Sequence, residues 1–178
     1  MNIVIIGYRA SGKTRVGRRV AQRLGWPYVD VDRGIEKATN KTIKQIFEEN
    51  GEPYYRQVEA GVAREMLGGD GQVVSFGGGT LMEPPNQALI NHHVLVVYLE
   101  APVDVLWQRA QADPESEKNR PPLLKSKGGR EEIVDMLKKR APVYEQFANL
   151  TLDATQDPEF LVDRVIEALP QAGPARDG

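Results

Sequence analysis

Eight residues near the start of this chain constrain its fold more than any other segment. Residues 7–14 read G-Y-R-A-S-G-K-T and match the pattern G-x-x-x-x-G-K-[ST] at every defined position. Such a phosphate-binding loop follows a buried strand and opens a helix. The apolar run at 3–6 and the helical spacing of Val16, Val20 and Leu24 fit that context, which argues against a chance match on a surface loop. The loop therefore predicts a nucleoside triphosphate as the ligand.

The chemistry of such a loop suggests roles for its residues. Consecutive backbone N–H groups and the positive end of the following helix form a concavity suited to phosphates. We expect Lys13 to bridge the β- and γ-phosphates and the Thr14 hydroxyl to bind Mg²⁺. The loop residues expected to contact the nucleotide are Ala10, Ser11, Gly12, Lys13, Thr14 and Arg15.

Composition argues against several classes of protein. A chain of 178 residues can bury one substantial core and is short for two domains. A net charge of -2 gives no reason to expect nucleic acid or an anionic membrane as a partner. Without cysteine there are no disulfides, thiolate metal sites or cysteine nucleophiles. The early strand leaves no room for a signal peptide, and no apolar run approaches the roughly 20 residues of a membrane span. We therefore expect a soluble, cytoplasmic protein.

Short apolar runs alternate with segments of helical period along the chain. Continuous apolar strands between helices are typical of a parallel sheet covered on both faces. We therefore predict a three-layer α/β/α fold with a five-stranded parallel sheet. The predicted strands are 3–6, 28–31, 73–76, 94–99 and 150–152. The predicted helices are 13–24, 32–39, 42–50, 53–67, 86–89, 103–110, 131–148 and 158–169.

Two segments depart from this alternation. From about 111 to 129 the chain is too long and too polar for an ordinary connection, so we expect a mobile lid within a single domain of residues 1–169. Arg120 in this lid would swing over the triphosphate and stabilise charge in the transition state; the alternative is a solvated charge in a polar loop. Residues 170–178 are rich in Pro, Gly and Ala and are expected to form a flexible tail.

Two aspartates stand at the end of the second predicted strand, where ligands of open α/β sheets bind. In V-D-V-D at 29–32, alternation along an extended chain would direct the carboxylates of Asp30 and Asp32 to the same side. Phosphoryl transfer requires one carboxylate near Mg²⁺, here through water, and one at the acceptor hydroxyl. The alternative is that Asp32 only caps the following helix. Capping accounts for one aspartate and leaves the pair unexplained.

The third predicted strand ends in three consecutive glycines at 77–79. Glycines allow backbone amides to approach a ligand closely, because no side chain intervenes. Ser75 and Phe76 stand where many P-loop enzymes place an aspartate associated with Mg²⁺. We therefore assign that role to Asp30 and water, with Ser75 close to the metal but not bound to it.

Two arginines are predicted to face inward. Arg140 lies on an apolar helical stripe, three residues after Leu137 and four before Tyr144. Arg56 heads another stripe, and Glu59 three residues later can orient it. A pair of inward guanidinium groups suits a small carboxylate ligand. The alternative is a pair of structural salt bridges, since buried charges are normally paired within the protein.

Together these elements resemble the shikimate kinase family, small P-loop kinases of the nucleoside-monophosphate-kinase type. A P-loop alone occurs in many enzymes, whereas this ordered set is highly specific and runs from Ile3 to about Leu169. Its elements are G-Y-R-A-S-G-K-T at 7–14, V-D-V-D at 29–32 followed by Ile35-Glu36, Y-R-x-x-E at 55–59, S-F-G-G-G at 75–79, R-P-P-L-L at 120–124 and K-R-A-P-x-Y at 139–144.

The resemblance implies transfer of the γ-phosphoryl group of ATP to the 3-hydroxyl of shikimate, with Mg²⁺, in aromatic amino-acid biosynthesis. Asp32 would bind the acceptor hydroxyls and take the proton. The residues implied to hold the shikimate carboxylate and ring are Arg56, Arg140, Gly78 and Gly79. Those implied to serve the phosphates and metal are Lys13, Thr14, Asp30 and Arg120, while Arg109 and Pro158 would flank adenine.

The sequence departs from the family pattern in two places. Ala10 replaces a glycine common in the loop, and R-P-P-L-L at 120–124 replaces the usual R-P-L-L; neither change removes a catalytic group. A related kinase of gluconate or nucleotides is one competing function, and it would not need two inward arginines beside Asp32. A nucleotide-binding protein without catalysis is another, disfavoured because every expected group is present. We expect a monomer, since no stretch demands a partner chain.

Overall fold

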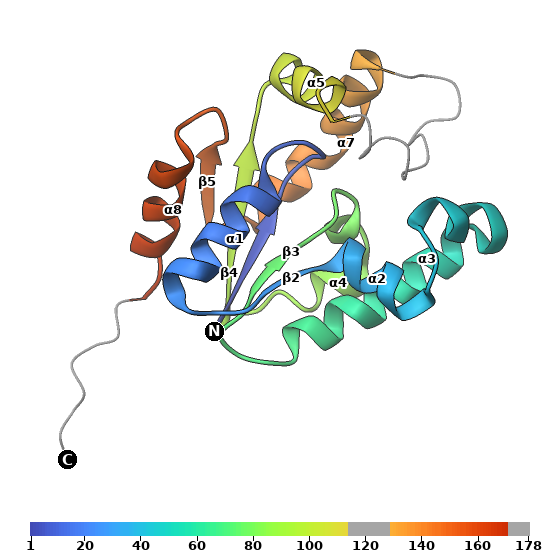
Figure 1. Cartoon of the computed structure of the whole chain (residues 1–178), viewed down its shortest axis with the longest axis horizontal. Helices are drawn as coiled ribbons and strands as arrows, with labels where there is room; N and C mark the ends of the chain where they lie inside the picture. The colour runs from blue at the N-terminus through green and yellow to red at the C-terminus, as the bar shows by residue number, and fades with distance from the viewer. Residues whose placement is uncertain (114–128, 171–178) are drawn as a thin grey trace.

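Five parallel strands form the centre of the molecule. The computed structural model describes residues 1–113 and 129–170, and Figure 1 shows the sheet with helices in front of it and behind it. The strand order is β2-β3-β1-β4-β5, and every neighbouring pair is parallel. The strands are β1 (Asn2–Ile6), β2 (Tyr28–Asp30), β3 (Val73–Ser75), β4 (Val94–Glu100) and β5 (Leu150–Asp153). The predicted five-stranded parallel sheet is confirmed.

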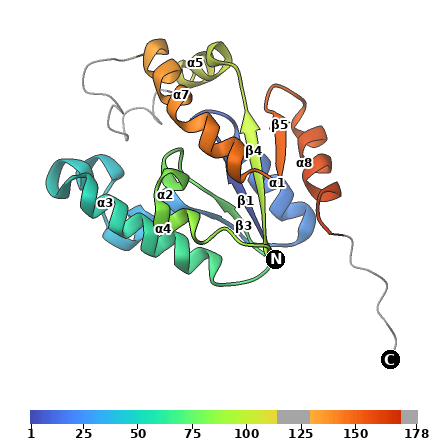
Figure 2. The ribbon, with the colours of Figure 1, turned by 180° about the vertical axis from the view of Figure 1, so that it is seen from behind.

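The helices bury both faces of this sheet. They are α1 (Lys13–Leu24), α2 (Val31–Thr39), α3 (Ile43–Leu67), α4 (Pro84–Gln87), α5 (Val103–Gln111), α7 (Arg130–Phe147) and α8 (Pro158–Glu167), with a short 3-10 helix, η1 (Thr80–Met82). Figure 1 shows α1 and α8 on the near face, and Figure 2 shows α3, α4 and α7 on the other.

The central strand β1 shows why the sheet needs covering on both sides. Ile3 and Ile5 pack into the core beneath α1 and α8, while Val4 and Ile6 pack into the core formed with α2 and α3. All four side chains are at most 1% exposed. Burial of each contributes about 1.5–3 kcal/mol relative to an exposed position. Alternating side chains therefore serve two cores, and the run at 3–6 has no polar position.

Most predicted elements agree with the structure within two residues at each end, and three of the differences have a clear local cause. The predicted strand at 28–31 ends one residue earlier, because Asp30 caps α2 by accepting a hydrogen bond from the Arg33 N–H at 3.2 Å. The predicted helices 42–50 and 53–67 form the single element α3, interrupted at Gly51, which has φ 80 and ψ 171. The predicted helix at 86–89 is instead α4 at 84–87, because two prolines occupy its first turn.

Chain direction sets where the functional residues meet. Since all strands are parallel, their carboxyl ends lie at one edge, and the segments that follow them form a common rim.

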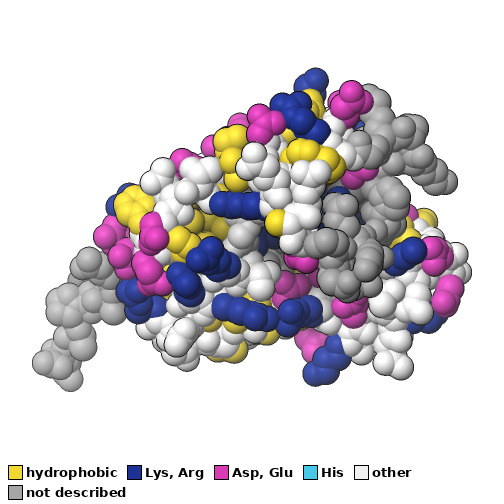
Figure 3. Space-filling view, turned by 45° about the horizontal axis from the view of Figure 1, so that its top comes forward, with side chains coloured by type: hydrophobic (Ala, Val, Ile, Leu, Met, Phe, Trp, Pro, Cys, Tyr) yellow, Lys and Arg dark blue, Asp and Glu magenta, His cyan; other side chains and the backbone are white. Residues whose placement is uncertain are grey.

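Charged side chains of both signs are interspersed over the face shown in Figure 3. In the two described ranges, no helix combines the length and the apolar character needed to cross a membrane.

Candidate active site

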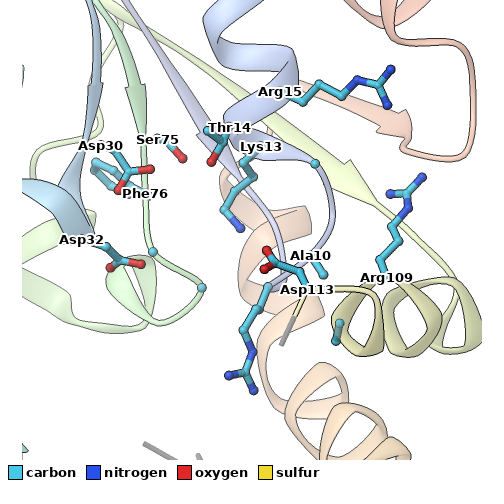
Figure 4. Close-up of a pocket in the computed structure, with 15 residues that line it drawn as sticks. Ala10, Lys13, Thr14, Arg15, Asp30, Asp32, Ser75, Phe76, Arg109 and Asp113 are labelled. Carbon is cyan, nitrogen blue, oxygen red and sulfur yellow. The ribbon is translucent and has the colours of Figure 1, made fainter. Parts of the chain in front are cut away.

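A cavity of about 310 Å³ opens at the carboxyl edge of the strands. The phosphate-binding loop, the ends of β2 and β3, and α5 surround it. Figure 4 shows Lys13 and Thr14 pointing into the space between Asp30 on one side and Arg109 on the other. The predicted nucleotide-contacting loop residues that line the cavity are Ala10, Gly12, Lys13, Thr14 and Arg15.

The loop backbone adopts conformations that favour glycine. A Cβ at Gly7 would lie 2.7 Å from the Leu99 carbonyl oxygen, and Gly12 has φ 98. Ala10 also has a positive φ, 64. For a residue with a side chain, the left-handed region costs roughly 1–2 kcal/mol. Ala10 therefore adopts a left-handed conformation that glycine would adopt at lower energetic cost.

Lys13 and Arg109 fix the loop from two directions. The Lys13 ammonium donates hydrogen bonds to the carbonyl oxygens of Gly7 and Tyr8, each at 2.9 Å. Arg109 donates through Nη1 to the Ser11 carbonyl at 3.3 Å and through Nη2 to the Ala154 carbonyl at 2.8 Å. The Arg109 guanidinium thus joins the loop to the chain just after β5.

Two predicted nucleotide-contacting residues stand outside the cavity lining. Ser11 is 2% exposed, and within the described part of the chain its hydroxyl has no hydrogen-bond partner. Pro158 opens α8 next to its cap, Asp157, and lines neither this cavity nor its neighbour. Arg120 and residues 114–128 of the predicted lid lie outside the described residues, as do 171–178 of the predicted tail.

Asp30 and Asp32 both line the cavity, although the predicted geometry was wrong. Asp30 ends β2 and is itself the cap of α2, whereas Asp32 lies in the first turn of that helix. The two carboxylates therefore reach the same space from a strand end and a helix start, and not by alternation along an extended chain. The alternative that Asp32 is the capping residue is also wrong, because Asp30 accepts the capping hydrogen bond.

A second cavity, of about 80 Å³, adjoins the first. Both cavities are lined by Arg9, Asp32, Gly77 and Gly78, so they share a wall. Tyr55 and Phe47 of α3 add apolar surface to the second cavity, and Arg56 and Arg140 add positive charge. The structure thus brings the phosphate-binding loop, Asp32 and the two predicted arginines together.

The three glycines after β3 make room for these side chains. A Cβ at Gly77 would lie 2.6 Å from Asp32 Oδ1, and one at Gly78 would lie 2.9 Å from Arg140 Nη1. At Gly79, a Cβ would lie 3.1 Å from both terminal nitrogens of Arg56. Contacts under 3.0 Å are not tolerated by real Cβ atoms, so larger residues would displace the charged groups. The sequence G-G-G lets three functional side chains approach one short segment of backbone.

Arg56 is anchored by carboxylates, as the salt-bridge alternative predicts. It forms ion pairs with Glu59 at 2.8 Å, Glu52 at 3.3 Å and Glu83 at 3.4 Å. The Glu59 side chain is 1% exposed and also accepts a hydrogen bond from the Thr80 hydroxyl at 2.8 Å. Burial raises the pKa of Glu59, and the neighbouring guanidinium of Arg56 opposes part of that rise. The buried carboxylate holds Arg56 in place at the cavity wall.

Arg140 differs from Arg56 in having no acidic partner among the residues that the structure describes. It is 6% exposed, and it makes no ion pair with any acidic side chain in residues 1–113 and 129–170. Its guanidinium lies 5.8 Å from the centre of the Tyr8 ring and close enough to the Tyr144 hydroxyl to lower its pKa, against the larger effect of burial. Tyr144 in turn donates to the Gly78 carbonyl. Neutral groups thus orient this buried cation toward the second cavity, and the salt-bridge alternative is not met for Arg140 among these residues.

Two charged residues of the site were not among the predicted ones. Arg9, an undefined position of the loop motif, lines both cavities and lies 3.5 Å from the Glu132 carboxylate of α7. Glu132 is 5% exposed. Asp113, just after α5, lines the first cavity. A charged residue inside the loop motif was the available signal for Arg9, whereas no motif marks Asp113.

Comparisons with known proteins agree on one family. A family model described as shikimate kinase matches residues 9–170. The shikimate kinase of Salinibacter ruber is 40% identical, with 98% of this chain and 88% of the relative covered. That of Ruegeria pomeroyi is 38% identical, with 94% and 84% covered.

Among solved structures, members of the family resemble this chain more closely than proteins that share only its fold. The shikimate kinase from Acinetobacter baumannii in complex with shikimate has a TM-score of 0.85 and 35% identity, covering 93% of this chain and 90% of that chain. A gluconokinase from Sinorhizobium meliloti, at 19% identity and a TM-score of 0.64, shares the fold. The family model, the relatives and the structure with shikimate all lead to the same assignment: this chain belongs to the shikimate kinase family.

Proposed function

We propose that this protein is a shikimate kinase, which transfers the γ-phosphoryl group of ATP to the 3-hydroxyl of shikimate and releases shikimate 3-phosphate and ADP. This reaction belongs to aromatic amino-acid biosynthesis. The observation that carries the proposal is the shared wall between the two cavities, formed by Arg9, Asp32, Gly77 and Gly78. Phosphoryl transfer depends on bringing donor and acceptor together in line, and adjoining cavities provide that arrangement.

The phosphate side of the reaction is assigned to the loop. Lys13 would bind the β- and γ-phosphates, exchanging its present contacts with the Gly7 and Tyr8 carbonyls for phosphate oxygens. Backbone N–H groups from residues 10–15 would hold the remaining oxygens. Arg109 holds the loop through its hydrogen bond to the Ser11 carbonyl, and we assign it a position beside the nucleotide base. Arg120 is proposed to close over the phosphates, and Pro158 to border adenine.

Asp32 is assigned the acceptor hydroxyl, because it belongs to the walls of both cavities. In the transfer, the oxygen of the 3-hydroxyl forms a bond to the γ-phosphorus while the bond to the β–γ bridging oxygen breaks. The hydroxyl proton passes to the Asp32 carboxylate, and ADP leaves with the electrons of the broken bond. Asp32 also orients the attacking oxygen, which is the larger requirement of a loose phosphoryl-transfer transition state.

The shikimate carboxylate is assigned to Arg140 and Arg56. Arg140 is a buried cation oriented by neutral groups, so a bound carboxylate would supply the counter-charge that the described residues do not. Arg56 presents further N–H donors to the same cavity, while its ion pair with Glu59 holds the guanidinium in place. Gly78 and Gly79 allow the ligand and both guanidinium groups to lie close to the same backbone.

The residues at the loop and β2 fit a magnesium ion. Thr14, Asp30 and Ser75 line one cavity with hydroxyl and carboxylate oxygens, the ligand type that Mg²⁺ prefers. No group of three or more acidic or histidine side chains suited to a metal occurs in the described ranges. A nucleotide-borne Mg²⁺ does not need one, because phosphates and waters complete its shell. We assign Thr14 as a direct ligand and Asp30 as a partner through water; the ion would neutralise phosphate charge.

A single acceptor assay tests this function. ADP release would be measured by a coupled assay with ATP, Mg²⁺ and, in turn, shikimate, gluconate and nucleoside monophosphates. We expect turnover with shikimate and none above background with the others. Turnover with gluconate or a nucleotide instead would assign the chain to a related kinase. Nucleotide binding without shikimate-dependent ADP release would identify a non-catalytic relative.

A further inference from the structure

Tyr28 lies directly behind the Asp30 carboxylate. Both residues belong to β2 and are two positions apart, so their side chains lie on the same face of the strand. The Tyr28 hydroxyl donates a hydrogen bond to Asp30 Oδ2 at 3.2 Å. Tyr28 is not part of the cavity lining, whereas Asp30 is. The phenol therefore acts on the site only through the groups that it contacts.

The side chains of Thr14 and Ser75 lie near enough to this hydroxyl to lower its pKa, against the larger effect of burial. A phenol has one hydrogen, and here that hydrogen goes to Asp30, so toward other hydroxyls its oxygen can only accept. Ser75 faces Asp30 across the β2–β3 pairing. Burial and the nearby Asp30 charge raise the pKa of Tyr28, which keeps the phenol protonated at neutral pH.

The aromatic ring is held so that this oxygen has a fixed place. A Cβ at Gly17 of α1 would lie only 2.7 Å from Tyr28 Cε2, so the missing side chain at Gly17 makes room for the ring. The Arg18 guanidinium lies 5.7 Å from the centre of the same ring. Two adjacent residues of α1 thus locate the phenol between the helix and the edge strand of the sheet.

We propose that Tyr28 is a positioning residue for the divalent-cation site: its hydroxyl donates to Asp30 Oδ2 and so orients the carboxylate at the cavity wall. This inference rests on the proposed function, in which Thr14 and Asp30 serve the metal of the nucleotide. A donor held against one carboxylate oxygen fixes the direction in which the carboxylate presents its lone pairs to a metal and its waters.

The variant Tyr28→Phe removes the hydroxyl and keeps the ring. Calorimetric titration would measure the affinity for ADP in EDTA and for ADP with excess Mn²⁺, used as the metal probe. We expect the Mn²⁺-dependent gain in ADP affinity to fall about tenfold, the lower end for lost partners of metal ligands. Affinity for ADP in EDTA, KM for shikimate and kcat at saturating Mg²⁺ should stay close to wild type, while the Mg²⁺ concentration for half-maximal rate rises.

Two further variants make the result decisive. Tyr54→Phe, at a side chain 42% exposed, is the matched control and should leave the Mn²⁺-dependent gain unchanged. Gly17→Ala keeps the phenol but displaces its ring, so it should weaken the gain in the same direction, even if Tyr28→Phe does not fold. A wild-type gain in Tyr28→Phe, or in a folded Gly17→Ala protein if Tyr28→Phe does not fold, would overturn the inference. Absence of shikimate turnover in the wild-type protein would instead overturn the proposed function.

Discussion

Replacing Arg140 with methionine removes a buried charge that no described carboxylate neutralises. Methionine keeps an unbranched apolar side chain in the space of the arginine stem, so packing against Tyr8 and Tyr144 is largely kept. If the substrate carboxylate is the anion for Arg140, the loss falls on shikimate binding. Because that contact exists in both ground and transition states, KM should rise while kcat changes little.

The size of the effect follows from the kind of contact. A hydrogen bond to a charged partner contributes about 1.5–3 kcal/mol, which corresponds to a rise in KM for shikimate of about 10- to 150-fold. Protein stability should respond differently. Burying a cation without an acidic partner among the described residues costs desolvation free energy, so the free energy of unfolding of Arg140→Met should stay within about 1 kcal/mol of wild type, the size of one hydrogen bond.

Arg56→Met is the informative comparison, because Arg56 pairs with a buried carboxylate. Breaking such a pair leaves Glu59 unpaired and costs about 3 kcal/mol, the lower end of the range, since the Arg56 side chain is 21% exposed. Steady-state kinetics at saturating ATP and urea unfolding would measure both variants. A KM for shikimate within twofold of wild type in Arg140→Met, or equal losses of stability in the two variants, would refute the reasoning.

Three other perturbations test separate parts of the structure. Lys13→Ala should lower kcat about 10²–10³-fold, as expected for one lost transition-state donor, with a melting curve that stays cooperative; unchanged turnover would remove Lys13 from the reaction. Ala10→Gly should raise the free energy of unfolding by about 0.5–1 kcal/mol, since relief of φ 64 exceeds the added freedom of the unfolded chain; a loss in urea unfolding would contradict this. Glu59 has a folded pKa above its ordinary value of 4.5, so the stability linked to its protonated form is present below that value and is lost as pH rises through the folded pKa. Unfolding curves across pH should therefore show that loss in wild type and a flatter profile in Glu59→Gln, and parallel profiles would exclude Glu59 as the source.

The sequence predicted the sheet and its loop because both depend on local patterns. The apolar run at 3–6 has no polar position, which is sufficient to indicate a strand buried on both faces. The pairing of Arg56 with Glu59 was also accessible, since residues three apart on a helix lie close together. Sequence spacing along one helix therefore predicted contacts within that helix correctly.

Contacts between distant elements were harder to predict. Either aspartate in V-D-V-D has the chemistry of a helix cap, and only the backbone shows that Asp30 takes that place and Asp32 follows it. Nothing in the helical stripe of Arg140 indicates whether an acid from another element meets it. Tyr28 reads as one more aromatic residue of a strand, although its ring lies against Gly17 of a different element.

The three glycines after β3 lie against functional side chains from three separate helices, so a substitution in this one turn affects residues far away in the sequence. A methyl group at position 77 would press on the acid of α2, one at 78 on a guanidinium of α7, and one at 79 on that of α3. Neighbouring substitutions should therefore produce distinct phenotypes, an impaired chemical step at 77 and weakened acceptor capture at 78 and 79. Substitutions at these three positions would therefore be a way to reshape the acceptor pocket for a different substrate without changing the charged side chains themselves.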